Sequence, residues 1–146
     1  YRARYTRFTH DEQITMMTLW GIFRSPLMMG GEMRDNDEFT LSLLQNRELI
    51  DMLKNSSGAR QFKREETDGK GEIIWTSNGK NCKYVALFNT DDEEREISFD
   101  ITDISIGGVK YSVWDMWAHE EYTVTDNEFS AKVNSHGARL FRIEIK

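Results

Sequence analysis

The carboxylates that come nearest to a catalytic pair are Glu32 and Asp35, which follow a short apolar run. Two carboxylates beside a substrate can divide the roles of acid and base between them. Both residues also have a structural interpretation, because Asp35 can cap a following helix and Glu32 lies near the opposite charge of Arg34. The structural interpretation is the stronger one. We therefore assign no catalytic residue and leave substrate-binding residues unassigned.

The sequence contains no residue pattern typical of a metal site or of a catalytic nucleophile. His10, His119 and His136 are far apart, and no His-x-x-x-His or Cys-x-x-Cys spacing occurs. We therefore expect neither a metal site nor a cofactor. Cys82 opens an apolar run and is interpreted as a packed side chain in preference to a reactive thiol. The context of a nucleophile elbow or a phosphate loop is lacking around Ser25, Ser135, Gly30 and Gly31.

Three further groups of side chains could bind a ligand. The acidic run Asp91–Glu94 lacks the ordered spacing of a calcium site and predicts a solvated hairpin tip. Tryptophans at strand spacing could stack on a sugar, but they are more typical of a core or a domain interface: Trp75, Trp114 and Trp117. The N-terminal stretch alternates basic and aromatic residues as a nucleic-acid arm would: Tyr1, Arg2, Arg4, Tyr5, Arg7 and Phe8.

Composition narrows the classes of partner. A net charge of −6 argues against nucleic acid and gives no reason to expect an anionic membrane surface. No apolar run approaches the ~18 residues of a membrane span. The 146 residues, with 38% hydrophobic and 30% charged side chains, fit a soluble globular protein of one domain or slightly more. A single cysteine and a polar start at Tyr1 leave the localisation open, with secretion or the periplasm compatible, and suggest a truncated N-terminus.

Helical periodicity governs the first third of the chain. A capping box at Thr9–Glu12 begins a helix that ends near Arg24, because Pro26 follows. One apolar face is expected to be buried, and further apolar residues widen it: Met16, Leu19, Trp20 and Phe23, then Ile14, Met17 and Ile22.

The short apolar run Leu27–Met29 suits a buried parallel strand. Asp35 or Asn36 is expected to cap the next helix, Asn46 to interrupt it, and a further short helix to continue to about Lys54.

Beyond a link in which Gly58 is expected in a left-handed conformation, the period changes to two. Asn78-Gly79 lies between two apolar runs and predicts a hairpin turn. Alternation places Ile97 and Phe99 on one face of a later strand. About eight short strands at regular turn spacings predict an antiparallel β-sandwich.

The stretch from Leu19 to Ile50 resembles the end of the catalytic barrel of glycoside hydrolase family 27, the α-galactosidases and α-N-acetylgalactosaminidases. The matching motifs are Leu19-Trp20, Pro26-Leu27, the Gly-Asn-Asp-Leu-Arg-like Gly30–Arg34 and the Asn-x-Glu-Val-Ile-like Asn46–Ile50. Looser matches follow in the family's C-terminal β domain, at Asp115-Met116-Trp117 and His136-Gly137.

Two departures limit what the resemblance carries. Lys54–Gly58 replaces an Asn-Gln-Asp-Pro-Leu-Gly-like segment and keeps only its glycine. The family's two catalytic aspartates belong to earlier barrel strands, upstream of Tyr1, and neither of their motifs occurs in this sequence. A retaining glycosidase needs two carboxylates ~5 Å apart across the sugar, so the resemblance implies a chain that is inactive alone.

The expected fold class is α+β, with residues 1–58 a helical and short-strand remnant of a (β/α)8 barrel and residues 59–146 an antiparallel β-sandwich. The resemblance implies the C-terminal fragment of a retaining glycoside hydrolase that acts on terminal α-galactosides of oligosaccharides. The sugar, galactose or N-acetylgalactosamine, is decided upstream.

The partner of this fragment would be the missing barrel portion or a second copy. The tryptophans would then anchor sandwich to barrel, and the N-terminal arginines would lie in a solvated loop near the mouth of the site, with sugar contact as the second interpretation. The alternative is a non-catalytic carbohydrate-binding or interaction module.

Overall fold

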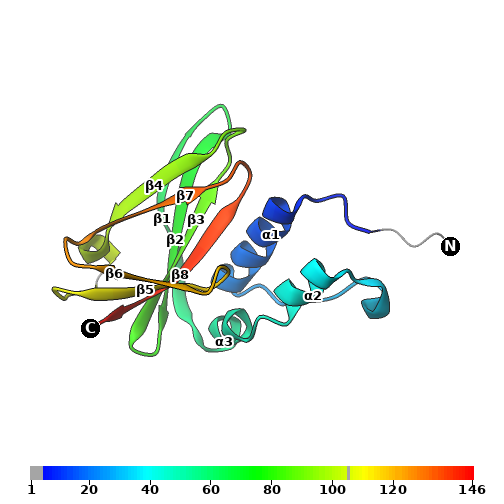
Figure 1. The fold of residues 1–146 in the computed structure, drawn as a ribbon, viewed down its shortest axis with the longest axis horizontal. Coiled ribbons are helices and arrows are strands. Elements are labelled where there is room, and N and C mark those ends of the chain that lie inside the picture. The colour runs from blue at the N-terminus through cyan, green and yellow to red at the C-terminus, as the bar shows by residue number, and fades with distance from the viewer. Residues whose placement is uncertain (1–4, 105) are drawn as a thin grey trace.

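The computed structural model describes residues 5–104 and 106–146, with helices and strands in separate parts (Figure 1). The helical elements come first: α1 (His10–Phe23), the 3-10 helix η1 (Met33–Asp35), α2 (Glu38–Leu44) and α3 (Arg47–Asn55). The strands follow, with one 3-10 helix among them: β1 (Ser57–Thr67), β2 (Lys70–Gly79), β3 (Cys82–Asn89), β4 (Arg95–Asp100), η2 (Ile101–Ile104), β5 (Tyr111–Asp115), β6 (Glu120–Val124), β7 (Glu128–Val133) and β8 (Ala138–Ile145).

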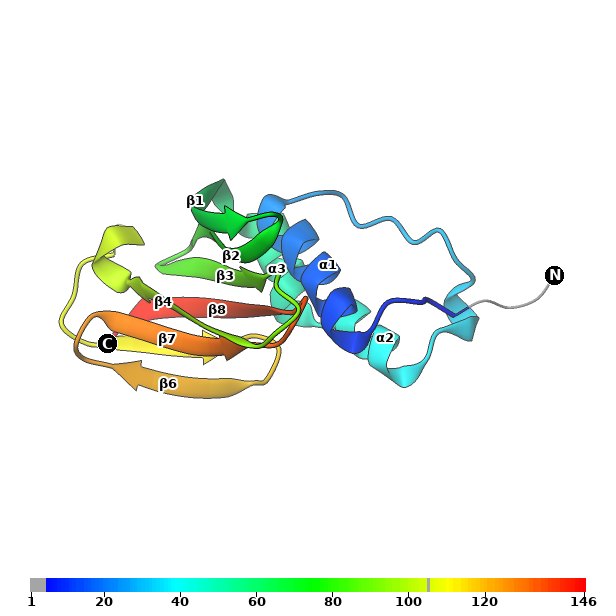
Figure 2. The same ribbon diagram turned by 90° about the horizontal axis from the view of Figure 1, so that it is seen from above.

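The strands form the predicted antiparallel sandwich. The larger sheet has the order β1-β2-β3-β8-β5-β6, and β4 pairs with β7 in a second sheet that lies over it (Figure 2). Apolar side chains from both sheets meet in one core, among them Val85, Ile97, Val133 and Phe141. Period-two alternation therefore predicted this core correctly.

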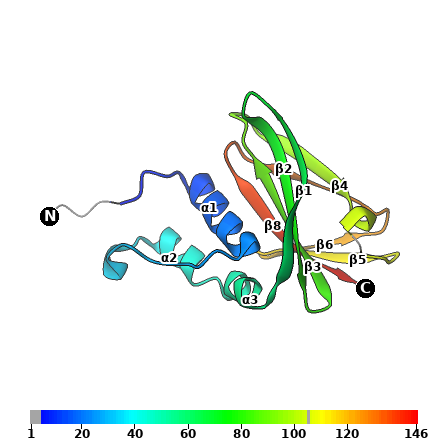
Figure 3. The same ribbon diagram turned by 180° about the vertical axis from the view of Figure 1, so that it is seen from behind.

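The central strand β3 is apolar almost throughout because both of its faces are covered. Val85 and Leu87 face the second sheet, whereas Tyr84, Ala86 and Phe88 belong to a second apolar cluster beneath the helices. Figure 3 shows the helices on the side of the large sheet opposite to β4. The molecule thus has three layers, and β3 lies in the middle one.

Local signals set the ends of α1 as predicted. The Thr9 hydroxyl accepts from the amide of Glu12, and the Glu12 carboxylate accepts from the amide of Thr9, at 3.2 and 2.7 Å. Arg24 adopts a left-handed conformation at φ 60° and closes the helix before Pro26. The capping box and the proline therefore predicted both ends.

The predicted apolar face of α1 is only partly buried, which is a correction. Leu19 and Phe23 stay 41% and 57% exposed. Met17 and Ile22 are buried as predicted, and they are joined by three residues that were not predicted: Gln13, Thr18 and Gly21. Gly21 explains the difference, because a Cβ there would lie 2.5 Å from Cδ1 of Leu49, so its absence lets α3 approach closely.

The expected strand at Leu27–Met29 does not form in this structure. The segment is irregular, and no strand in the described residues pairs with it. A parallel strand exists only through hydrogen bonds to its neighbours, and the described residues supply none beside Leu27. Met28 is 81% exposed.

Two further predictions, a helix cap and a hairpin turn, were each displaced along the chain. Asp37, and neither Asp35 nor Asn36, caps α2 by accepting from the amide of Thr40 at 2.7 Å. The β2–β3 hairpin forms as predicted, but Gly79 pairs with Cys82, so Lys80 and Asn81 make the turn. Asn81 takes the positive φ of 59° there.

Asn46 separates α2 from α3 as predicted, and it also caps α3. Gly58 has φ +61°, the left-handed conformation that was predicted. Within the ranges described, no helix is both long enough and apolar enough to cross a membrane.

Candidate functional site

Glu32 and Asp35 lie on the exposed stretch between α1 and α2. Glu32 caps η1 and forms a fork with Arg34, with Nε–Oε1 and Nη2–Oε2 distances of 3.0 Å each. Hydrogen bonds from Arg34 hold the pKa of the Glu32 carboxyl below its ordinary value. A carboxylate engaged with its near neighbour suits a structural role better than proton donation.

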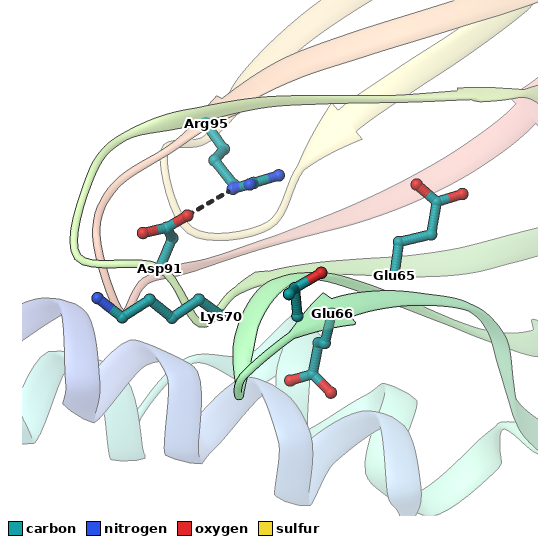
Figure 4. Close-up of a pocket in the computed structure, with 6 residues that line it drawn as sticks. Glu65, Glu66, Lys70, Asp91 and Arg95 are labelled. Atoms are coloured by element: carbon teal, nitrogen blue, oxygen red, sulfur yellow. Dashed lines mark hydrogen bonds and ion pairs between the residues drawn. The ribbon is translucent and has the colours of Figure 1, made fainter.

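The acidic run Asp91–Glu94 forms the loop between β3 and β4, beside a polar hollow of about 550 Å³ at the β1–β2 hairpin. Figure 4 shows that Asp91 faces Arg95, whereas the carboxylates of Glu65 and Glu66 point away from this pair. The Asp91–Arg95 ion pair measures 3.1 Å and lowers the pKa of Asp91. These charges neutralise one another locally and do not converge on a common point.

The other polar candidates are also separate from one another. In the described residues no cluster of three metal-ligating side chains occurs. His10 stacks on Phe39 of α2, with ring centroids 3.7 Å apart. Cys82 is buried, and burial raises the pKa of its thiol, which opposes thiolate formation. Tyr5, Arg7 and Phe8 are exposed in irregular chain, whereas Tyr1, Arg2 and Arg4 lie outside the described residues.

The three tryptophans of the sandwich lie at its contact with the helices. Trp75 meets Phe23 edge to face, at 5.6 Å between ring centroids. The Trp114 indole donates to the Glu48 carboxylate of α3 at 2.8 Å. Trp117 packs there too. The structure therefore uses these side chains as anchors of an interface, and the indole N–H groups of Trp114 and Trp117 donate to residues of the helical part.

A surface of largely exposed apolar side chains lies on α1 and the segment after it. We call it the open helical face, and it consists of Leu19, Phe23, Met28, Met29 and Met33, which are 41%, 57%, 81%, 43% and 63% exposed. A cavity of about 80 Å³ lies behind it, lined by Met16, Trp20 and Leu27 among others. Exposed apolar surface of this kind is typical of sites that contact protein, a membrane or a ligand.

Sequence reasoning missed the polar contacts that hold the helices on the sheet. Asp115 is fully buried and pairs with Arg139, with Oδ2–Nε at 2.7 Å. The Asn46 amide donates to the carbonyl of Met116 at 2.8 Å, and Trp117 Nε1 donates to Oγ1 of Thr18 at 2.8 Å. The Asp-x-Trp pattern was the available signal, although nothing local could name its partners.

Comparison with known proteins places this geometry in a family. The family described as the alpha galactosidase C-terminal beta sandwich domain matches residues 69–143, just over half of the chain. A probable alpha-galactosidase D of Aspergillus oryzae is 31% identical over 143 residues, covering 91% of this chain and 21% of its own length. Alpha-galactosidase 2 of Arabidopsis thaliana is 24% identical, covering 92% and 34%.

Solved structures agree in fold. A glycoside hydrolase family 27 β-L-arabinopyranosidase from Geobacillus stearothermophilus is 41% identical, with a TM-score of 0.89 over 98% of this chain and 32% of that one. Alpha-galactosidase I of Mortierella vinacea is 20% identical with a TM-score of 0.84, covering 95% and 36%. The chain thus spans between a fifth and about a third of the length of the curated relatives it matches. It belongs to the alpha-galactosidase C-terminal β-sandwich family, the C-terminal domain of glycoside hydrolase family 27 proteins.

Proposed function

We propose that this chain is the C-terminal part of a longer retaining glycoside hydrolase. In this proposal residues 1–58 complete a (β/α)8 barrel, with Leu27–Met29 as its last strand, and residues 59–146 form the sandwich beside it. The open helical face is the observation that carries the proposal, because it lies next to an extended segment that lacks a strand partner in the described chain. Neighbouring barrel units would supply both the missing strand and the missing apolar contacts.

The described start of the chain supports the same arrangement. Residues from Tyr5 to Thr9 extend from the helical part, on the side away from the sandwich (Figures 1 and 3). Polypeptide upstream of these residues would therefore arrive beside the open helical face and not beside the second sheet.

The chemistry would then belong to the upstream part. Retention of configuration requires a nucleophilic carboxylate and an acid/base carboxylate about 5 Å apart. Glu32 is held by Arg34, and the acidic loop Asp91–Glu94 lies at the sandwich, apart from the open helical face. This chain would contribute structural support and part of the barrel wall, and would have no hydrolase activity by itself.

For the substrate we propose a terminal α-galactoside, following the names of the matched relatives. A β-L-arabinopyranoside is the second candidate, favoured by the 41% identity to the Geobacillus enzyme over nearly the whole chain. The two sugars have the same ring configuration, and arabinopyranose lacks only the exocyclic hydroxymethyl group. Selection between them would depend on a pocket around that group, outside this chain.

The test compares the longer protein with the 146-residue chain on aryl α-galactoside, aryl β-L-arabinopyranoside and aryl α-N-acetylgalactosaminide. We expect hydrolysis with retained configuration by the longer protein on one of these three substrates, and none by the chain alone. Turnover by the chain alone, at a mass that shows no upstream residues, would contradict the proposal. Absence of turnover by the longer protein on all three would contradict it as well.

A further inference from the structure

Two turns of the sandwich end on two threonines of α1, one helical turn apart. Trp117, in the turn between β5 and β6, donates its indole N–H to Oγ1 of Thr18 at 2.8 Å. Thr15 donates its hydroxyl to the carbonyl of His136, in the turn between β7 and β8, at 2.7 Å. We propose that these two turns together position α1 on the sandwich through Thr15 and Thr18. We call the two turns, at Trp117 and His136, the clamp.

The first turn of the clamp, at Trp117, is held in place by a buried carboxylate. Oδ1 of Asp115 accepts from the amides of Trp117 and Ala118, at 2.8 and 2.7 Å. Its Oδ2 accepts from Nε of Arg139 at 2.7 Å, and Asp115 has no exposed surface. A buried charge needs all of these partners to offset its loss of hydration. In return it fixes the direction in which the Trp117 indole leaves the sheet.

The second turn of the clamp, at His136, is held by a residue at the end of β3. His136 has φ 53°, in the left-handed region that residues other than glycine seldom adopt. The side-chain amide of Asn89 donates to the carbonyls of Val133 and Asn134 at 3.1 Å each, at the start of this turn. Asn134 in turn donates to the carboxylate of Asp11 on α1 at 3.1 Å. The turn therefore contacts α1 at two points.

The clamp holds more than α1, because α1 and α3 form one unit. Gly21 allows the close approach of Leu49 described above. The Arg24 guanidinium donates to the carbonyls of Leu53 and Lys54, at 3.0 and 3.2 Å, and so joins the end of α1 to the end of α3. Fixing α1 on the sandwich therefore also fixes α3 and the start of the segment after Arg24.

The consequence for catalysis rests on the proposed function. There the segment after α1 is a barrel strand, and the end of a barrel strand contributes to the active site. Thr18 and Trp117 would then be positioning residues, which act on the reaction through the placement of α1 without touching the substrate. Small displacements of such a unit can lower catalytic efficiency markedly, even from a distance.

The first experiment uses the 146-residue chain and amide hydrogen exchange. Thr18→Val removes the acceptor of the Trp117 indole at nearly constant shape, and Thr18→Ser keeps a hydroxyl as the matched control. We expect amides of α1 and α3 to exchange about threefold to tenfold faster in Thr18→Val, with β2 and β3 unchanged and Thr18→Ser close to wild type. Equal acceleration in helices and strands, or no acceleration at all, would overturn the clamp.

Thr15→Val is a second variant that keeps the clamp testable if Thr18→Val does not fold. It removes the hydroxyl that donates to the carbonyl of His136. We again expect faster amide exchange that is confined to α1 and α3. If the strands lose protection as much as the helices do, the contact supports overall stability only and the inference is wrong.

The second experiment uses the longer protein and measures kcat and KM separately on its best aryl glycoside. We expect Thr18→Val to lower kcat/KM about tenfold at a temperature where β2 and β3 keep their protection, and Thr18→Ser to restore it. Unchanged kcat/KM in Thr18→Val would overturn the positioning role. If the wild-type longer protein hydrolyses none of the substrates, the proposed function fails, and the exchange experiment alone decides whether the clamp exists.

Discussion

The two faces of the large sheet are built on different principles. The face toward β4 and β7 is a closed apolar core, whose members Leu87, Phe141 and Ile143 are fully buried. The face toward the helices mixes apolar packing with polar links such as Asn46 to Met116 and Trp114 to Glu48. Apolar packing stabilises any arrangement of side chains that fills the core volume. Directed hydrogen bonds, in contrast, fix how two elements are oriented relative to each other. The sheet therefore uses its inner face for stability and its outer face to place the helices.

The largest effect should follow from opening the inner core. Phe141 is fully buried and packs edge to face on Phe129, at 4.9 Å between ring centroids. Phe141→Ala leaves a cavity and is expected to lower the free energy of unfolding by about 4 kcal/mol. Urea titration followed by circular dichroism measures this loss. A loss below about 1 kcal/mol would mean that the inner face does not dominate stability.

The next effect concerns the polar link between α3 and the sheet. Asn46 caps α3 by accepting from the amide of Leu49 at 3.0 Å, and it donates to the carbonyl of Met116. Asn46→Ala removes both bonds and is expected to cost about 1–2 kcal/mol. Asn46→Asp is the matched control, since it keeps the cap and loses only the donor. If Asn46→Asp were as stable as wild type, the sheet contact would add nothing.

A change on the open helical face should hardly alter stability. Met28 is 81% exposed, so Met28→Gln is expected to change the free energy of unfolding by less than about 0.5 kcal/mol. The same change should weaken self-association of the chain alone, as measured by light scattering, because it removes exposed apolar surface. Stability loss above about 1 kcal/mol would instead make Met28 part of the core.

The smallest effect is expected from acid. Hydrogen bonds from Lys70 and His136 hold the pKa of Asp92 below its ordinary value of 3.8. A carboxyl with a lowered pKa in the folded state contributes stability above its unfolded pKa and loses it as the pH falls through the folded value. The melting temperature should therefore fall slightly below about pH 4, and Asp92→Asn should reduce this dependence. An identical pH profile in that variant would show that Asp92 makes no such contribution.

The sequence predicted what local rules decide. The capping box at Thr9 and Glu12 set the start of α1, and alternation placed Ile97 and Phe99 in the inner core. Such signals depend on residues within one turn or one strand of each other. The same reasoning placed the β2–β3 hairpin but misjudged its turn by two residues, because the strand pairing extends to Gly79.

What the sequence could not predict depends on partners far away along the chain. The Thr18–Trp117 bond joins residues 99 positions apart, and no spacing rule reaches that far. On α1 the burial of Gly21, Thr18 and Gln13 was missed, because the periodicity of large apolar side chains does not detect small or polar residues on the buried face. The strand predicted at Leu27–Met29 is not observed for a related reason. In the proposal above, the neighbouring strands that would pair with it lie outside this chain.

The position of β8 has a consequence for the order of events during synthesis. The last strand, Ala138–Ile145, lies in the middle of the large sheet and pairs with β3 on one side and β5 on the other. A nascent polypeptide that still lacks β8 therefore has two half-sheets with unpaired edges and an unclosed core. Because such edges invite intermolecular pairing, the growing chain is most exposed to aggregation in the interval before β8 takes its place between β3 and β5.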